Sequence, residues 1–175
     1  MKFCNSLLSM VYLTSLYVFT CETKIFHPKH CQRAQLEKNT EDLYNKTVSF
    51  KRLFPKDNIT DIQLLTKQLK EDFMAQKNCN LRNNLLSFYI NTFLENTLVK
   101  EKAKKFKIID KLMVIQDLLL HCKKSHCDQK ETESKSFREL KKKTCQIHGK
   151  RVLWKAISEM DILVEWIQEY IEEML

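Results

Sequence analysis

Histidine and cysteine, the side chains that most often bind zinc, gather at two places in this chain. The two groups are His27, His30 and Cys31 near the start, and His121, Cys122, His126 and Cys127 further along. Such groups can supply the nitrogen and sulfur ligands of a tetrahedral zinc site. They can equally mark a disulfide at a helix end with surface histidines beside it. Because the chain begins with an apolar leader that indicates an oxidising compartment, the disulfide interpretation is favoured and no metal or cofactor is predicted.

Carboxylates crowd the last apolar stretch of the chain, where a pair at helical spacing could perform acid–base catalysis. They are Glu159, Asp161, Glu165, Glu169, Glu172 and Glu173. The apolar residues between them follow a helical period, so a solvated face on an amphipathic helix explains them more simply. The only glycine, Gly149, excludes the glycine-rich phosphate loops and the nucleophile elbow. The chain is therefore not predicted to be an enzyme.

The first residues of the 175-residue chain have the pattern of a secretory signal peptide. Lys2 supplies a positive charge, and residues 7–19 are apolar apart from small hydroxyl side chains. That run is shorter than the ~20 residues that a membrane-spanning helix needs. We expect residues 1–21 to be removed, with cleavage near positions 20–23, and residues 22–175 to form one secreted domain.

The seven cysteines agree with secretion. Cys4 and Cys21 leave with the signal peptide, so five remain, and two disulfides with one unpaired thiol are expected. Several pairings are open from the residues alone. Two N-glycosylation sequons also fall in the mature chain, at Asn45 and Asn58, each followed two residues later by threonine.

The composition favours helices over sheets. Hydrophobic residues make up 43% of the chain, enough for a core, whereas glycine occurs once and proline twice. A β-sandwich or a parallel sheet needs many tight turns, which consume both residues. Apolar periodicity indicates six helical stretches, at about residues 39–53, 60–75, 81–98, 108–122, 137–147 and 156–174. We therefore predict an all-α bundle with one continuous core, in which residues 100–107 form a basic linker.

Two basic segments suggest binding rather than catalysis. Residues 100–111 hold six lysines and two acids, and residues 138–151 hold six basic residues and one acid, in a chain of formal net charge +8. A charge run is usually a solvated face. The alternative is a site for heparan sulfate, nucleic acid or anionic membrane, if the two segments fold onto one side. Its candidate residues are Lys102, Lys104, Lys105, Lys107, Lys141, Lys142 and Lys143.

The most specific signal is the string KAISEMDIL at residues 155–163. It resembles the final-helix signature of the interleukin-10 family of class II helical cytokines, in which the same lysine, alanine, glutamate and aspartate recur at these spacings. Residues 64–73 and 85–89 are similar to the second and third helices of that family. The resemblance covers nearly the whole mature chain and implies the six-helix class II cytokine bundle.

The resemblance implies a secreted cytokine without catalytic activity. Such a protein bridges two class II cytokine receptor chains on target cells and triggers Janus kinase–STAT signalling. The receptor chains that the resemblance indicates are the interleukin-20 receptor alpha chain and the interleukin-10 receptor beta chain. A monomer and a homodimer that exchanges its last two helices both remain open. The rival function is a cationic host-defence protein that acts through the basic segments.

Site residues also follow from the resemblance. In the family, the higher-affinity receptor chain packs against the first helix, the loop after it and the last helix. Carried over by position, the candidates are Lys46, Lys51, Arg52, Lys56, Asp57, Ser158, Glu159, Asp161 and Gln168. For the cysteines, the resemblance selects the pairs Cys31–Cys122 and Cys79–Cys127, and leaves Cys145 unpaired or joined to another molecule.

Overall fold

The structure, a computed structural model, describes residues 31–75, 78–122 and 133–174. Within these ranges the regular structure is helical, and no strand is present. The helices are α2 (Arg33–Lys51), α3 (Lys67–Met74), α4 (Cys79–Phe88), α5 (Lys100–Lys105), α6 (Ile108–His121), α7 (Lys135–Gln146), α8 (Arg151–Ser158) and α9 (Met160–Met174). A π-helical segment, Tyr89–Leu94, continues α4 directly. The prediction of an all-α bundle is confirmed.

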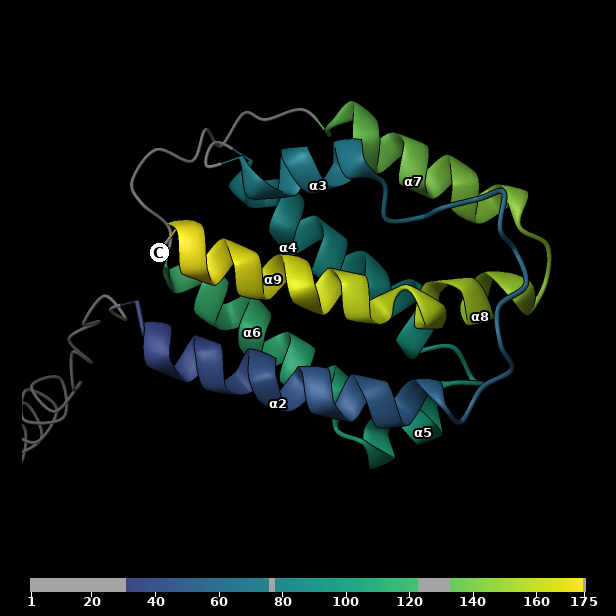
Figure 1. Cartoon of the computed structure of the whole chain (residues 1–175), viewed down its shortest axis with the longest axis horizontal. Coiled ribbons are helices and arrows are strands. Elements are labelled where there is room, and N and C mark those ends of the chain that lie inside the picture. The colour runs from purple at the N-terminus through teal and green to yellow at the C-terminus, as the bar shows by residue number, and fades with distance from the viewer. Residues whose placement is uncertain (1–30, 76–77, 123–132, 175) are drawn as a thin grey trace, which may run out of the picture.

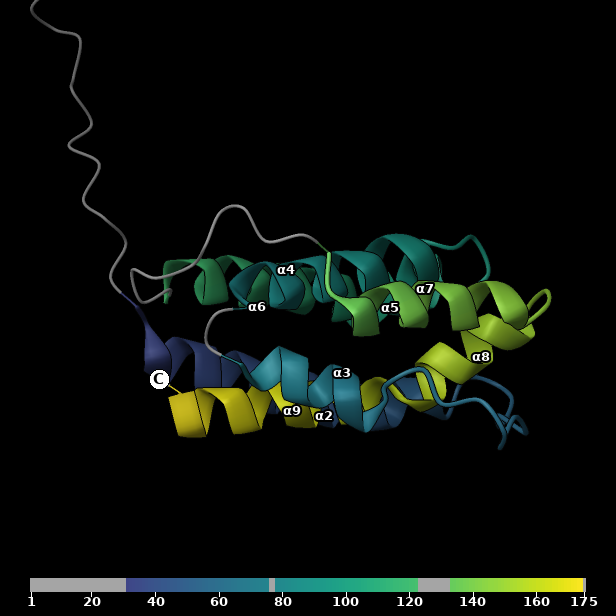
Figure 2. The same cartoon turned by 90° about the horizontal axis from the view of Figure 1, so that it is seen from above.

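The helices pack in two layers around one apolar core (Figures 1 and 2). In one layer, α9 lies between α2 and α3 and contacts both. In the other layer α6 packs against α4, and α6 also contacts α2 across the core. This arrangement places α2 and α9, which are far apart in sequence, side by side.

Apolar stripes on α2 and α9 explain why these helices meet. Leu36, Leu43 and Phe50 recur every seven residues along α2 and are fully buried. Leu163 and Ile167 of α9 are equally buried. Each such side chain contributes about 1.5–3 kcal/mol when it leaves water, so the pairing of the two helices is strongly favoured.

The helix predicted from residue 60 begins later than expected. The structure places its first residue at Lys67, and the Thr66 side chain caps it by accepting a hydrogen bond from the Leu69 backbone N–H at 3.3 Å. Residues 52–66 therefore form a long loop between α2 and α3. Leu64 and Leu65 are nevertheless buried, which is why their spacing resembles that of a helix.

Further boundaries differ from the prediction, among them two in the second half of the chain. The last predicted helix is two helices, α8 and α9, which are separated at Glu159. Ala156 and Met160 keep their helical spacing across this break, so the periodicity does not reveal it. Residues 100–107, predicted as a linker, contain α5, and the turn to α6 is made at Lys107 with a left-handed φ of 56°.

A disulfide joins Cys31, just before α2, to Cys122, at the end of α6, as the resemblance implies. It closes a span of 91 residues and so ties the start of the described chain to the opposite layer. Cys145 is a free, exposed thiol on α7. The predicted pair Cys79–Cys127 lies outside the described residues, since Cys127 falls in the gap at 123–132.

Replacing Cys31 and Cys122 together with serine is expected to lower the free energy of unfolding by about 4 kcal/mol. The reason is that the chain-entropy model assigns this much to the closure of a long loop. Urea denaturation of the double variant and of the unaltered protein measures the difference. Cys145→Ser is the matched control, because an exposed unpaired thiol should contribute less than about 0.5 kcal/mol. A double variant as stable as this control would contradict the prediction.

Other predictions also fall outside the described ranges. The signal peptide at residues 1–21 and the histidines His27, His30 and His126 belong to this group. In the part of the chain that the structure describes, no helix is long and apolar enough to cross a membrane. The same residues hold no cluster of three or more histidine, cysteine, aspartate or glutamate side chains that could hold a metal ion.

Candidate functional site

An open groove lies where the end of α2, the loop after it and the α8–α9 junction meet. Its volume is about 660 Å³. It is lined by Val48, Lys51, Arg52, Phe54, Pro55, Lys56, Asp57, Ile157, Ser158 and Asp161. Three segments that are far apart in sequence thus build one concave surface.

Six of the nine predicted receptor-binding residues line this groove: Lys51, Arg52, Lys56, Asp57, Ser158 and Asp161. The Lys51 ammonium and the Asp161 carboxylate form an ion pair of 2.5 Å that joins α2 to α9. Both side chains are half-buried, whereas Arg52 and Lys56 are exposed. The groove therefore presents two accessible positive charges beside a paired one.

Aromatic packing holds the first part of the loop in place. The Phe54 ring lies 4.9 Å from the Phe50 ring and 5.4 Å from the Trp154 ring, measured between centroids. The Lys102 amine lies 4.6 Å from the centroid of the Phe54 ring and donates a hydrogen bond to the Leu53 carbonyl at 3.2 Å. These contacts fix the apolar floor of the groove, because Phe54 is buried.

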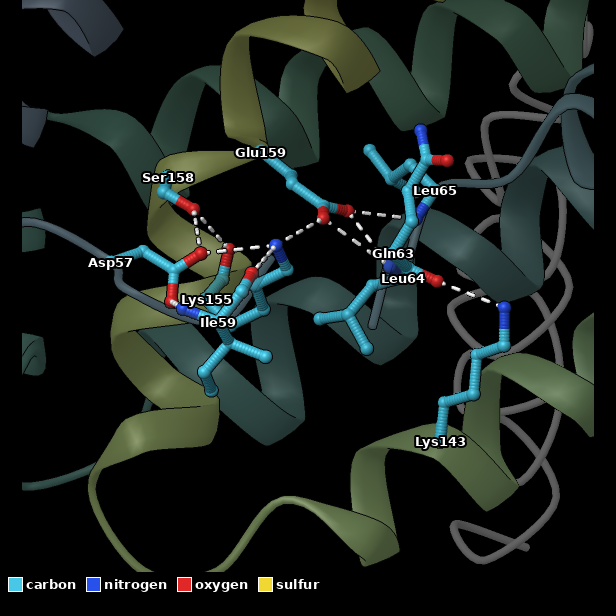
Figure 3. Close-up of polar contacts among 9 residues, drawn as sticks. All are labelled: Asp57, Ile59, Gln63, Leu64, Leu65, Lys143, Lys155, Ser158 and Glu159. Carbon is cyan, nitrogen blue, oxygen red and sulfur yellow. Dashed lines mark hydrogen bonds and ion pairs between the residues drawn. The ribbon is translucent and has the colours of Figure 1, made fainter. Parts of the chain in front are cut away.

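A buried lysine holds the second part of the loop (Figure 3). The Lys155 amine of α8 lies 3.0 Å from Asp57 Oδ2 and 3.2 Å from Glu159 Oε1, and it donates a hydrogen bond to the Ile59 carbonyl at 2.8 Å. The Lys155 and Asp57 side chains are each only 10% exposed, and that of Glu159 is 7% exposed. One cation thus neutralises two carboxylates away from water, the condition under which buried charges are tolerated.

Glu159 holds the end of the same loop. Its Oε2 accepts hydrogen bonds from the backbone N–H groups of Leu64 at 3.0 Å and of Leu65 at 2.8 Å. Figure 3 shows the carboxylate between these two amides and Lys155. The loop has no regular structure there, so Glu159 satisfies donors that would otherwise be buried without partners. The break between α8 and α9 occurs at this residue.

The electrostatics of this cluster follow from its geometry. Burial alone would lower the pKa of Lys155, but the hydrogen bonds to Asp57 and Glu159 outweigh it and the pKa is raised. Tyr89, buried in the π-helical segment, has its pKa raised well above the usual value, first by burial and then by the charges of Glu159 and Asp161. The lysine is therefore a cation and the phenol is neutral at physiological pH.

Three of the nine predicted receptor-binding residues lie outside the groove, and one of them is Glu159, whose buried carboxylate is engaged with the loop and with Lys155. Lys46, also outside the groove, pairs with Asp42 at 2.5 Å on α2. Gln168 lies on α9 in a separate groove beside the N-terminal half of α2. Lys155 belongs to the family signature at residues 155–163 but was not among the predicted site residues, although its spacing of four from Glu159 was a usable signal.

The structure separates the two basic segments. Figure 1 shows α5 and α7 at opposite edges of the bundle, so the helices that carry six of the seven predicted lysines do not lie side by side. Lys143 is half-buried and donates a hydrogen bond to the Gln63 carbonyl at 3.0 Å, so it supports the loop. Lys141 pairs with Glu133, while Lys142 is exposed on α7.

Comparison with known proteins agrees with this architecture. The family model described as Interleukin 10 matches residues 6–173. The chain is 34% identical over 140 residues to interleukin-26 of Homo sapiens, covering 80% of this chain and 78% of that protein. It is 30% identical over 122 residues to interleukin-24 of Mus musculus, covering 65% and 66%. It is 28% identical over 124 residues to interleukin-10 of Saimiri sciureus, covering 69% and 67%.

The matched residues include α2, the loop after it and α9, which build the groove, as well as the cluster around Lys155. A cytokine acts by binding and is not an enzyme, which agrees with the sequence prediction. With an all-α bundle and a family match over nearly the whole chain, the chain belongs to the interleukin-10 family of cytokines.

Proposed function

We propose that this cytokine signals by bridging two class II cytokine receptor chains, and that the groove at the α2–α9 end binds the first of them. The observation that carries the proposal is the meeting of six predicted contact residues in one groove. They come from three segments, and the Lys155 cluster holds the loop among them rigidly. A preorganised surface loses little conformational entropy on binding.

The chemistry of the groove defines the surface that would fit it. Its floor is apolar, formed by Val48, Phe54 and Ile157, and its rim carries Arg52 and Lys56. A receptor loop with an apolar or aromatic side chain and flanking carboxylates would complement both features. Interfaces of this kind concentrate their affinity in a few central residues.

The receptor pair that we propose is the interleukin-20 receptor alpha chain with the interleukin-10 receptor beta chain, followed by Janus kinase–STAT signalling. The similarity to interleukin-26 supports this choice. We also propose that residues 1–21 are a cleaved signal peptide and that the mature chain is secreted.

Cells that carry defined pairs of class II receptor chains provide the test. Phosphorylation of STAT factors should rise when both proposed chains are present and should be absent when either one is missing. Arg52→Glu with Lys56→Glu should raise the half-maximal concentration by about tenfold or more, because it reverses the charge of the rim. Lys67→Glu with Lys104→Glu, at exposed positions away from the groove, is the matched control. STAT phosphorylation that does not depend on which receptor chains the cells carry would refute the assignment.

Polyanion binding is a second candidate, favoured by one face of α7. Lys135, Arg138, Lys141 and Lys142 are all exposed there, with Glu139 among them and Glu133 paired with Lys141. Such a surface can attract sulfate or phosphate chains and release their counterions. The site would be one helix face rather than a surface shared with α5.

Heparin chromatography should distinguish a binding site on this face of α7 from binding through the net charge of the whole protein. Changing Arg138, Lys141 and Lys142 to serine should lower the salt concentration of elution more than changing Arg33, Lys38 and Lys67 does. Both triple variants remove three charges at exposed positions, so their net charges are equal. The physical reason is that clustered cations release counterions from the same polyanion segment. Co-elution of the two variants would leave net charge as the explanation.

A further inference from the structure

The loop beside the groove carries one of the two glycosylation sequons, at Asn58. We propose that Asn58 is the glycosylated asparagine of this chain, and that its glycan stands at the rim of the groove and weakens the binding of the first receptor chain. The second half of this inference rests on the proposed function. Its first half depends only on the conformation of the loop.

The backbone around Asn58 displays the sequon to solvent. Asp57 and Ile59 point inward, with the Asp57 side chain 10% exposed and Ile59 5% exposed. Asn58 and Thr60 are both exposed. This alternation is that of an extended segment, in which successive side chains point to opposite sides. The amide and the hydroxyl of the sequon are thus accessible together.

The Asn45 sequon has the opposite character. It lies within α2, and although Asn45 is exposed, Thr47 is completely buried. A glycosylation acceptor is expected in a surface loop. Once α2 has formed, the threonine hydroxyl of this sequon faces the core, so the structure favours modification at Asn58.

The modification itself is a group transfer in the secretory pathway. The Asn58 amide nitrogen attacks the anomeric carbon of a lipid-linked oligosaccharide diphosphate. The new C–N bond forms as the C–O bond to the phosphate breaks, the amide loses one proton, and the lipid diphosphate leaves. The product is a bulky, hydrophilic glycan on the protein surface.

Lys155 fixes the position of that glycan. Asp57, just before Asn58, is ion-paired with Lys155, and the Ile59 carbonyl, just after it, accepts a hydrogen bond from the same amine. Figure 3 shows both attachments on the one lysine. Because the residues on both sides are anchored, the loop cannot swing the glycan away from the groove. Asp57 and Lys56, which line the groove, lie one and two residues before Asn58.

The test is secretion of the full chain from mammalian cells, with Asn58→Gln, Thr60→Ala and Asn45→Gln compared with the unaltered protein. Peptide mass analysis after enzymatic deglycosylation in heavy-oxygen water reports which asparagine carried a glycan. We expect Asn58 to be modified, and Asn58→Gln and Thr60→Ala to bind the interleukin-20 receptor alpha ectodomain about tenfold more tightly than the modified protein. Thr60→Ala keeps Asn58 and removes only the sequon, and Asn45→Gln should bind as the unaltered protein does.

A measurement that needs no receptor distinguishes a failure of the glycan inference from a failure of the proposed function. The acetylation rate of the Lys56 amine should increase when the glycan is lost, while that of the exposed Lys67 should not change. An unmodified Asn58 in the secreted protein, or equal receptor binding by all variants, overturns the inference. If no variant binds a class II receptor chain while Lys56 still becomes more reactive, the proposed function fails and the position of the glycan is supported.

Discussion

Replacing Lys155 with methionine is expected to lower the free energy of unfolding by about 3–5 kcal/mol, the usual cost of removing one partner from a buried charge pair. The substitution keeps most of the unbranched side chain but leaves Asp57 and Glu159 as neighbouring carboxylates with no cation between them. The raised pKa of Lys155 means that the cation, and the stability it gives, is present below its normal pKa and is lost only as the pH rises through the higher folded value.

Chemical denaturation at pH 7 measures this loss. Lys51→Met is the matched control, because the Lys51–Asp161 pair is half-exposed and should contribute about 1 kcal/mol or less. A triple variant, Lys155→Met with Asp57→Asn and Glu159→Gln, should recover part of the stability, since no unpaired buried charge remains. If Lys155→Met cost no more than Lys51→Met, the cluster would not hold the loop.

Charge reversal at Asp161 is expected to reduce signalling by about tenfold or more, which corresponds to roughly 1.4 kcal/mol of receptor binding. Asp161→Lys breaks the ion pair with Lys51 in the groove and places two positive charges together. The measurement is the half-maximal concentration for STAT phosphorylation. Glu173→Lys, an exposed reversal near the end of α9, should have little effect.

Circular dichroism must show that the Asp161→Lys variant is folded, because a folding defect would mimic a loss of binding. The charge swap, Lys51→Asp with Asp161→Lys, separates positioning from recognition. We expect it to restore stability, since the pair is rebuilt, but not signalling, since the receptor meets reversed charges. Equal potency of folded Asp161→Lys and Glu173→Lys would remove Asp161 from the site.

Several features of this cytokine could be predicted because they are local. The near absence of glycine and proline and the apolar period identified an all-α bundle. The seven-residue spacing of Leu36, Leu43 and Phe50 identified the buried face of α2, since side chains at that spacing share one helix face. The family resemblance of residues 155–163 then indicated the functional class and most of the groove.

Only the tertiary structure shows which residues of the family signature at 155–163 stabilise the fold. Lys155 and Glu159 have the spacing of a surface ion pair, yet both are buried, because a loop nearly 100 positions away brings Asp57, Ile59 and Leu64 to them. No pattern near residue 159 encodes those partners. The same long-range contacts hold residues 57–65 against the α8–α9 junction, and Asn58 is exposed beside the groove.

The placement of the two basic segments was likewise not predictable from the local sequence. The sequence determined how many lysines residues 100–111 and 138–151 contain, but not that α5 and α7 lie at opposite edges of the bundle. Periodicity reports which side of each helix faces the core, since burial of apolar surface is a local preference repeated along the chain. The relative placement of helices depends on how all those faces pack together, and only the folded structure specifies it.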